Sequence, residues 1–451
     1  MKIKLYRSAT VGIDLSGFKI LQDPWLTDGE YYGSWSHYPF YDLKSNLNEI
    51  NSYNAIYISH IHPDHCSDDT LKLINKKIPI YIHSYHTKFL KNKLERFGFK
   101  VIELANNKRH QLAQNAYINI YAADNCNPEL CYKFTACADL TAKEGSQQID
   151  TLSVIDDGKN ILINVNDCPF DLAKSTFKEI LKQYQKIDLL LTGYGGAGPY
   201  PQCFENLNIS EKKTAAKKKE NQFLNQAISY IKMLKPKYYL PFAGTYTLTG
   251  KLAKLQNIRG VPDIDSAYDF FEKYFNSNSD LKQTQALKIN PGVSFDISTG
   301  ESNNVYKKIN FEDYKNYIET YLVNKKLNYE NEESPGFDEL YELSKGAFLK
   351  FNEKKLINNI KLKTDIYVDL EENLIKLPKD KNTIEVISKK DFKSDTKFVC
   401  YKTDKRLLKK LLQGPRYAHW NNAEIGSHIR FYRNPNVFER EVYMAMCFFH
   451  N

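Results

Sequence analysis

Short apolar runs, most of them alternating with polar residues, recur along the first 300 residues and are separated by segments with helical periodicity. Alternation with a period of two indicates strands, and apolar residues three and four positions apart indicate helices. Two groups of strands with interleaved helices favour an α/β fold of two packed sheets with helices outside. The pattern predicts two strands separated by a turn within residues 3–26, and further strands at 55–59, 79–83, 116–121, 151–155, 160–165, 188–192 and 238–244. It predicts helices that begin near Asp68 or span residues 87–96, 173–185 and 211–234.

The pattern changes after residue 300. Residues 301–346 are charged and helical in pattern, with a break at Glu333-Ser-Pro-Gly336, and residues 414–436 are dense in polar and aromatic side chains. We therefore predict a domain over residues 1–300, a helical connector over 301–346, and a small α+β domain over 347–451 whose layout is similar to that of sterol-carrier domains. The elements expected in this last part are strands at 365–370, 374–377, 383–387 and 397–400 and a helix at 406–412.

Residues that carry chemistry concentrate directly after one predicted strand, in the string His60-Ile-His-Pro-Asp-His65. Side chains alternate along an extended chain, so His60 and His62 point to the same side. The proline introduces a bend that lets Asp64 and His65 point into the same cavity. A polar loop with four incidental residues is the simpler interpretation. However, three imidazoles and a carboxylate this close together favour a divalent cation, which satisfies all of them.

This H-x-H-x-D-H string resembles the signature of the metallo-β-lactamase superfamily, which implies an αββα sandwich. In that superfamily the first two histidines hold one metal, the Asp-His pair holds a second, and a carboxylate from a later strand bridges them. The resemblance assigns the bridging position to Asp167, which lies two residues beyond the strand at 160–165; a turn aspartate is the alternative. No histidine occurs where the third ligand of the first metal is expected, between residues 120 and 150, so Asp124 and Asp150 are the available donors.

The expected donor set is unusually rich in oxygen. The stretch that matches the superfamily's late histidine reads Pro241-Phe-Ala-Gly-Thr245 and contains none. Such a site suits iron or manganese at least as well as zinc, and we expect one or two iron ions. The expected ligands are His60, His62, Asp64, His65 and Asp167, with Asp124 or Asp150 as a further donor.

Several further segments together look like the metallo-β-lactamase part of the CMP-N-acetylneuraminate hydroxylase family, over about residues 8 to 260. Members of that family add an N-terminal Rieske domain, which passes electrons to the metal site for O₂-dependent hydroxylation of a nucleotide sugar. A Rieske centre needs paired Cys-x-His segments, and this sequence contains none, so the electron donor is expected to be a separate protein. The segments that carry the resemblance are Asp23-Pro-Trp-Leu26, Ile149-Asp-Thr151, Asn166-Asp-Cys168, Gly195-Gly-Ala-Gly198 with Pro201, and Pro241-Phe-Ala-Gly244, with a faint recurrence at Ile425-Gly426 and at Arg433-Asn-Pro-Asn-Val437.

Three features are candidates for substrate binding. Glycines let a backbone pass close to a ligand and present its N–H groups; an ordinary tight loop is the alternative. The aromatic residues at 29–41 form either a packed lid or a stacking surface for a substrate ring. The lysines at 212–219 form either a solvated helix face or an attraction for a phosphorylated substrate. The residues expected to receive an anionic part of the substrate are Gly195, Gly196, Ala197 and Gly198.

Composition adds little to this picture. The net charge of +9 is modest for 451 residues, and we expect no nucleic-acid partner. Eight cysteines follow no metal-binding spacing, which favours free thiols in a reducing cytosol over an iron–sulfur site. The N-terminus lacks the apolar run of a signal peptide, and no segment reaches the roughly 18–20 apolar residues of a membrane span. We therefore expect a cytoplasmic protein.

Three functions are compatible with these residues. The first expectation is an iron-dependent oxidoreductase, a monooxygenase that acts on an anionic sugar or nucleotide sugar. The alternative is a hydrolase in which two metals share a hydroxide that attacks a phosphoester, lactone or amide. The third is a binding module with a structural metal. Iron with oxygen-sensitive colour favours the first, and colourless zinc favours the second.

Overall fold

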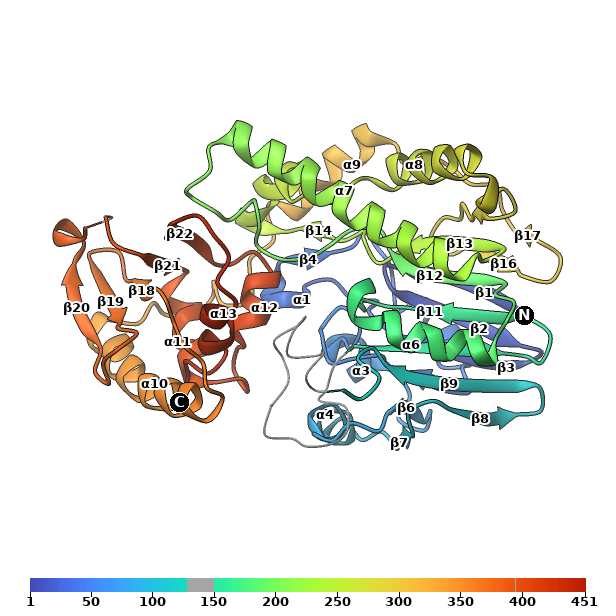
Figure 1. Cartoon of the computed structure of the whole chain (residues 1–451), viewed down its shortest axis with the longest axis horizontal. Helices are drawn as coiled ribbons and strands as arrows, with labels where there is room; N and C mark the ends of the chain where they lie inside the picture. The colour runs from blue at the N-terminus through green and yellow to red at the C-terminus, as the bar shows by residue number, and fades with distance from the viewer. Residues whose placement is uncertain (128–149, 394) are drawn as a thin grey trace.

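The computed structural model describes residues 1–127, 150–393 and 395–451. These residues form two lobes that lie side by side, with the N-terminus at the far end of the larger lobe and the C-terminus in the smaller one (Figure 1). Within the described residues, none of the helices combines the length and the apolar character needed to cross a bilayer.

The first sheet of the larger lobe has eight strands in the order β17-β16-β1-β2-β3-β5-β6-β7. Strands β3, β5, β6 and β7 run parallel, and the other pairs are antiparallel. The strand that precedes the histidine string is therefore central and paired on both sides. The strands span Lys2–Arg7 (β1), Thr10–Leu15 (β2), Phe18–Gln22 (β3), Ala55–Tyr57 (β5), Ile80–His83 (β6), Val101–Leu104 (β7), Ser294–Asp296 (β16) and Glu301–Ser302 (β17).

The second sheet has seven strands in the order β15-β13-β12-β11-β10-β9-β8. Strands β11, β12, β13 and β15 run parallel, and β8, β9 and β10 add an antiparallel half. The strands span Lys108–Ala113 (β8), Ala116–Ala122 (β9), Thr151–Asp156 (β10), Ile161–Asn164 (β11), Leu189–Gly193 (β12), Tyr238–Phe242 (β13) and Gln285–Ala286 (β15).

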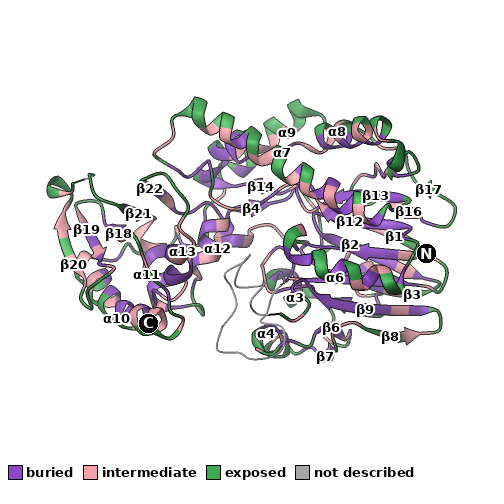
Figure 2. Cartoon of the chain, in the orientation of Figure 1, coloured by how far each residue is buried: buried purple, intermediate pink, exposed green. Residues whose placement is uncertain are grey.

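The two sheets pack face to face, and helices cover both outer faces. Side chains from both sheets, such as Ile13 and Ile118, share one buried core. A second core lies under the helices of the first sheet and a third under those of the second. Figure 2 shows the strands buried between helices whose outer faces are exposed. This confirms the predicted αββα sandwich. The covering helices are α3 (Asp68–Leu73) and α4 (Phe89–Arg96) on the first sheet, and α6 (Phe170–Gln183), α7 (Ile209–Leu234) and α8 (Ile264–Ser277) on the second.

The smaller lobe is built on a five-stranded sheet in the order β20-β19-β18-β21-β22. Helix α10 (Phe337–Ile357) runs straight through residue 346, where the sequence places the end of a connector. The division into three domains and the likeness to sterol-carrier domains stay predictions. The other elements of this lobe are β18 (Asp365–Asp369), β19 (Asn373–Leu377), β20 (Glu385–Ser388), β21 (Phe398–Lys402), β22 (Arg430–Asn434), η4 (Lys389–Asp391), α11 (Lys405–Gln413), α12 (Trp420–Ile425) and α13 (Arg440–Met446).

One apolar core continues from one lobe into the other. It contains Trp25 and Trp35 of the larger lobe together with Trp420 of the smaller one. At the junction, Phe204 and Phe431 stack with ring centroids 4.9 Å apart, and Glu205 N–H donates to the Phe431 carbonyl at 2.7 Å. The smaller lobe is therefore fixed against one end of the sandwich. The short elements near this junction and beyond it are α1 (Glu30–Gly33), β4 (Trp35–Ser36), α2 (Leu47–Ile50), β14 (Thr247–Leu248), η1 (Gly250–Ile258), η2 (Ser279–Leu281), α9 (Phe311–Tyr317) and η3 (Ile318–Leu322).

Candidate metal centre

The candidate site lies where strands of both sheets end. β5 ends at Tyr57, and the chain after it carries the histidine string. β11 ends at Asn164, three residues before Asp167. Asp150 directly precedes β10, the strand paired with β11. Because the two sheets are packed face to face, these segments meet at one edge of the sandwich.

Two groups of three side chains present donor atoms at this edge. Within each group, the donor atoms all lie within 4.8 Å of one another. The first group is His60, His62 and Asp150, and the second is His60, His65 and Asp167. His60 Nε2 lies 3.6 Å from Asp150 Oδ1, and His65 Nε2 lies 3.4 Å from Asp167 Oδ2. Asp64 Oδ2 lies 3.6 Å from the same His65 nitrogen. The two groups share His60, so the site has places for one cation or for two adjacent ones.

Each of the two buried histidines has one nitrogen occupied and one free. His65 Nδ1 donates to Asp23 Oδ2 at 2.9 Å, and His60 Nδ1 lies 2.9 Å from Ser59 Oγ. Asp23 also accepts hydrogen bonds from the Ser59 N–H at 2.7 Å and the Ser59 hydroxyl at 2.8 Å. His60 Nε2 and His65 Nε2 are buried and have no hydrogen-bond partner among the described residues. Metal-binding histidines typically have this arrangement, in which an outer partner fixes the ring and leaves the other nitrogen for the metal.

The third histidine is fixed by the other lobe. His62 Nε2 donates to Asn421 Oδ1 at 3.1 Å, which leaves Nδ1 as the nitrogen available to a metal in the first donor group. Asn421 lies on α12 and its amide donates in turn to the Tyr443 hydroxyl. The smaller lobe thus supplies the orienting partner of a candidate ligand. The polar composition of residues 414–436 was the only sequence signal for this contact.

The carboxylate of Asp64 is held by the aromatic segment at 29–41. Tyr31 donates its hydroxyl to Asp64 Oδ1 at 2.5 Å. Tyr31 and Trp35 are buried, and Trp35 stacks on Tyr246 with ring centroids 3.5 Å apart. The sequence left open whether these aromatics form a packed lid or a stacking surface. The two rings nearest the site are packed, whereas Phe40 is about half exposed.

Burial and neighbouring charges shift the pKa values of the side chains at the site. Burial, together with the neighbouring imidazoles of His65 and His62, holds the pKa of His60 well below its usual range. Burial raises the pKa of Asp64 and brings that of Asp150 to about 6. Burial also opposes ionisation of His65, but the surrounding carboxylates raise its pKa well above the ordinary value. A divalent cation bound in place of protons would compensate the charge of the carboxylates and would bind the imidazole nitrogens. The residues present therefore fit a metal.

Asp124 belongs to neither donor group. Its Oδ1 accepts from the Cys126 N–H at 2.9 Å, and burial raises its pKa to about 6. Among the described residues, Asp150 is the carboxylate that accompanies His60 and His62. The ligand roles of all these side chains stay predictions.

The glycine loop has a packing explanation. A Cβ at Gly196 would lie 1.9 Å from the Phe223 ring of α7, and one at Gly195 would lie 2.7 Å from Val261. Close packing therefore requires glycine at both positions, whatever else the loop binds. Receipt of a substrate anion by residues 195–198 stays a prediction.

No protein-family model matches the chain. Cytidine monophosphate-N-acetylneuraminic acid hydroxylase of Danio rerio is 26% identical over 240 residues, which cover 51% of this chain and 35% of that protein. The Cricetulus griseus hydroxylase is 25% identical over 279 residues, covering 58% of this chain and 44% of that protein. The Homo sapiens protein described as inactive is 24% identical over 257 residues, with 54% and 45% covered. The chain is a metallo-β-lactamase-fold protein related in sequence to these hydroxylases. It spans about a third to somewhat under half of their length.

Solved structures with this fold are more distant in sequence. Isothiocyanate hydrolase from Delia radicum gut bacteria is 16% identical, with a TM-score of 0.44, and is matched over 66% of this chain and 99% of that one. The metallo-β-lactamase fold protein YhfI from Bacillus subtilis is 11% identical, with a TM-score of 0.38, over 65% and 99%. The resemblance read from the histidine string is confirmed, and the strand order and donor positions carry the fold assignment.

The contact between the lobes gives the first prediction. Asn421→Ala should weaken metal affinity about tenfold, because His62 loses its orienting partner. The measurement is a competition titration with a chromogenic chelator, beside far-UV circular dichroism. Asn92→Ala, at an exposed position of α4, is the matched control and should bind metal like the wild type. Equal affinities for both variants would show that Asn421 does not position His62.

A second prediction concerns the stability of α12. Burial raises the pKa of Glu424 from 4.5 to about 8. Its contribution to stability is therefore complete below pH 4.5 and is lost as the pH rises through 8. Glu424→Gln should make the protein more stable than the wild type at pH 9, by a few kcal/mol, with a smaller difference at pH 6. Denaturant unfolding at both pH values measures this, with exposed Glu353→Gln as the control. A difference independent of pH would contradict it.

Proposed function

We propose that the chain is an iron-dependent oxidoreductase that hydroxylates an anionic sugar or nucleotide sugar, with electrons from a separate protein. The proposal rests on one observation. The donor cluster at the edge of the sandwich is built from the segments by which the chain resembles the CMP-N-acetylneuraminic acid hydroxylases. The similarity extends over about half of the chain.

The donor chemistry supports iron. Three imidazoles are accompanied by three carboxylates, and hard oxygen donors shift preference from zinc towards iron or manganese. Iron held by these residues would supply the one-electron and O₂ chemistry that no side chain provides. The ligands would be His60, His62 and Asp150 on one side and His65, Asp64 and Asp167 on the other.

The chain itself orients and encloses this site. Asp23 holds the His65 ring, Ser59 holds His60, and Asn421 holds His62. The Tyr31 hydroxyl leaves Asp64 with one oxygen free to face the metal. The stacked rings of Trp35 and Tyr246 belong to the apolar core that continues into the smaller lobe. Rigid support of this kind keeps ligand geometry fixed during reaction.

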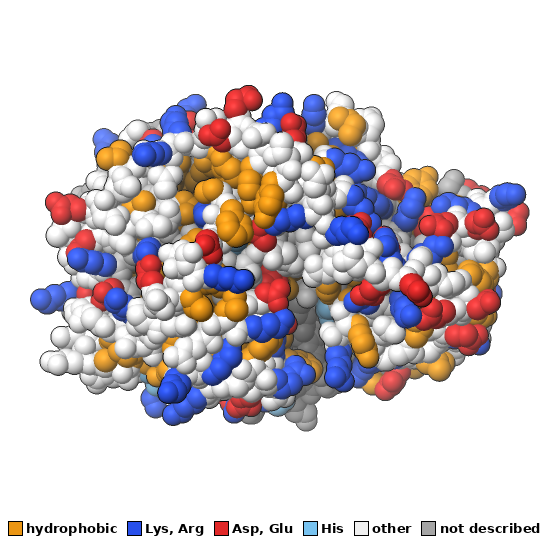
Figure 3. Space-filling view, turned by 180° about the vertical axis from the view of Figure 1, so that it is seen from behind, with side chains coloured by type: hydrophobic (Ala, Val, Ile, Leu, Met, Phe, Trp, Pro, Cys, Tyr) orange, Lys and Arg blue, Asp and Glu red, His pale blue; other side chains and the backbone are white. Residues whose placement is uncertain are grey.

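Positive charge near the lobe junction would attract an anionic substrate. Two lysines of α7 are anchored to the loop that follows the glycines. Lys212 Nζ donates to the Gln202 carbonyl at 3.3 Å, and Lys219 Nζ donates to the Tyr200 carbonyl at 3.0 Å. Burial and the nearby Arg259 lower the pKa of Lys219 to about 7, so Lys219 is only partly charged at neutral pH. Arg433 of β22 lies over the Phe204 ring at 4.5 Å. On the face in Figure 3, Lys and Arg side chains gather right of centre in the upper half. Such a field raises the local concentration of phosphates and carboxylates.

A second candidate is hydrolysis by two metals. The two donor groups share His60, so two ions placed there would lie close together, as in hydrolases that share a hydroxide between metals. A dinuclear zinc site would support attack on a phosphoester, lactone or amide.

Metal exchange separates the two candidates. Protein reconstituted anaerobically with iron should consume O₂ when given a chemical reductant and CMP-N-acetylneuraminic acid or another anionic sugar, and uptake should depend on the sugar. His60→Asn removes a donor shared by both groups, so this variant should lose metal. Its rate of O₂ uptake should fall at least about 100-fold, on the order expected for loss of a catalytic group. Zinc-loaded protein that hydrolyses a phosphoester, with no O₂ uptake from the iron form under any reductant, would instead establish the hydrolase.

A further inference from the structure

The larger lobe buries an arginine without a carboxylate partner. Arg7 is the last residue of β1 and only 5% exposed. Its Nη2 donates to the Phe40 carbonyl at 3.3 Å, but Nε and Nη1 have no hydrogen-bond partner among the described residues. Buried guanidinium groups are almost always paired with an anion, because burying a lone charge is expensive.

The one carboxylate that acts on Arg7 is already engaged. Asp28 Oδ2 accepts from Lys325 Nζ at 2.7 Å, and Asp28 Oδ1 accepts from the His37 backbone N–H at 2.9 Å. Arg7 itself forms no ion pair within the described part of the chain. Asp28 therefore acts on two cations, Lys325 and Arg7, but forms an ion pair only with Lys325.

The groups around Arg7 are donors that lack acceptors. His37 is 1% exposed, its ring packs on Trp25 at 4.1 Å between centroids, and neither ring nitrogen has a hydrogen-bond partner of ordinary geometry among the described residues. Burial and the nearby Arg7 hold the pKa of His37 at about 3, so the ring is neutral, and its one N–H has only a poorly aligned contact with the Trp25 backbone. The hydroxyls of Tyr41 and Tyr317 are also buried without a partner in the described residues.

These unpaired groups are close enough to act together. The Tyr41 ring centroid lies 5.5 Å from the Arg7 guanidinium carbon. Tyr41 and Tyr317 both act electrostatically on Arg7, as Arg7 does on His37. Most buried polar groups in folded proteins are paired, so several unpaired donors around one cation call for a common acceptor. Water would satisfy the donors without neutralising the charge, whereas an anion does both.

We propose that Arg7, His37, Tyr41 and Tyr317 form a binding site for a small anion, namely a halide or the carboxylate or phosphate of a small molecule. This site is separate from the metal centre. Tyr31, which binds Asp64, packs on Trp35, Trp35 packs on Trp25 at 6.0 Å, and Trp25 packs on His37 at 4.1 Å. A series of aromatic contacts therefore links the two sites, and Asp64 and His37 lie at its opposite ends.

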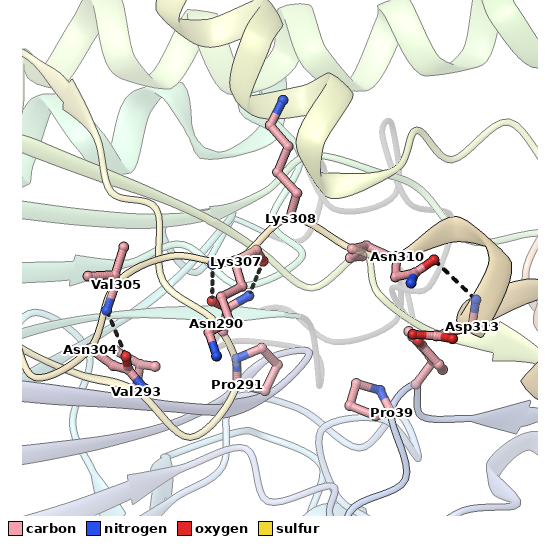
Figure 4. Close-up of a pocket in the computed structure, with 12 residues that line it drawn as sticks. Pro39, Asn290, Pro291, Val293, Asn304, Val305, Lys307, Lys308, Asn310 and Asp313 are labelled. Carbon is pink, nitrogen blue, oxygen red and sulfur yellow. Dashed lines mark hydrogen bonds between the residues drawn. The ribbon is translucent and has the colours of Figure 1, made fainter.

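A surface cavity of about 350 Å³ is lined by residues that neighbour the site, among them Tyr38 and Pro39. The Tyr38 ring contacts Tyr317 at 5.4 Å, and the carbonyl of Phe40 that binds Arg7 follows Pro39 in the chain. Figure 4 shows Pro39 and Pro291 on one side of this cavity, with Lys308 extending away from them. Lys307 and Lys308 also line this cavity and add positive charge near the site.

The test is thermal unfolding of the metal-free full-length protein, so that it does not depend on the proposed function. Ionic strength is held constant with a bulky sulfonate salt while chloride, inorganic phosphate or formate replaces it. At a hundredfold excess over its Kd, a bound anion should raise the Tm by about 3 °C. Preference for chloride or phosphate would identify a free inorganic ion as the occupant, and preference for formate a carboxylate-bearing molecule.

Matched variants make the result specific. Arg7→Met should abolish the saturable rise in Tm, whereas Arg96→Met, at an exposed position of α4, should retain it. His37→Phe keeps an aromatic ring against Trp25 but removes the N–H, and should weaken the anion at least tenfold, which keeps the test valid if Arg7→Met does not fold. Absence of a saturable rise in the wild type with all three anions would overturn the proposal. So would an unchanged rise in Arg7→Met or, where that variant does not fold, in His37→Phe.

Discussion

The central constraint on this structure is the crowding of three imidazoles and three carboxylates, several of them buried, at one edge of a sandwich of two sheets. His60 and His65 are almost fully buried, and Asp64, Asp150 and Asp167 surround them. Polar groups with no partner are costly in such a place, and carboxylates near one another resist ionisation together. A cation at their centre resolves both costs. The folded geometry therefore favours metal binding before any substrate is considered.

The smaller lobe contributes to the candidate metal site through α12. Its core is continuous with that of the sandwich, so α12 is held at a fixed position. From there Asn421 orients His62, and His428 donates from Nε2 at 2.7 Å to the carbonyl of Tyr31, the same tyrosine whose hydroxyl binds Asp64. The two lobes thus share one network of hydrogen bonds around the candidate ligands. A metal centre supported from both sides is expected to lose affinity when the smaller lobe shifts.

The sequence predicted the regular elements of the sandwich well. The strand expected at 116–121 is β9 (Ala116–Ala122), and the helix expected at 211–234 is α7 (Ile209–Leu234), whose capping box joins Asn208 and Glu211. Periodicity is a local signal, so long elements are the easiest to recognise. Helix α8, between residues 264 and 277, was not predicted, and α10 runs across the expected boundary at 346.

The site was predictable only as far as its residues are close together in the sequence. The histidine string was recognisable from its spacing, and Asp167 was assigned by the family resemblance from its place after a strand. The contact between His62 and Asn421 joins positions 359 apart, and no local pattern encodes it. Gly195 and Gly196 show that a local pattern can also have two explanations. A glycine required by packing, against Val261 or the Phe223 ring, looks the same in the sequence as a glycine that approaches a ligand.

Anomalous X-ray diffraction at the iron absorption edge, from crystals of protein purified without oxygen, tests the central claim most directly. A metal held by the first donor group would give a peak about 2.0–2.2 Å from His60 Nε2, His62 Nδ1 and an oxygen of Asp150. The Nε2 atom of His62 would remain bonded to Asn421 in the same map. A map with no peak between these three side chains, or with a peak that His62 does not contact, would contradict this account of the site.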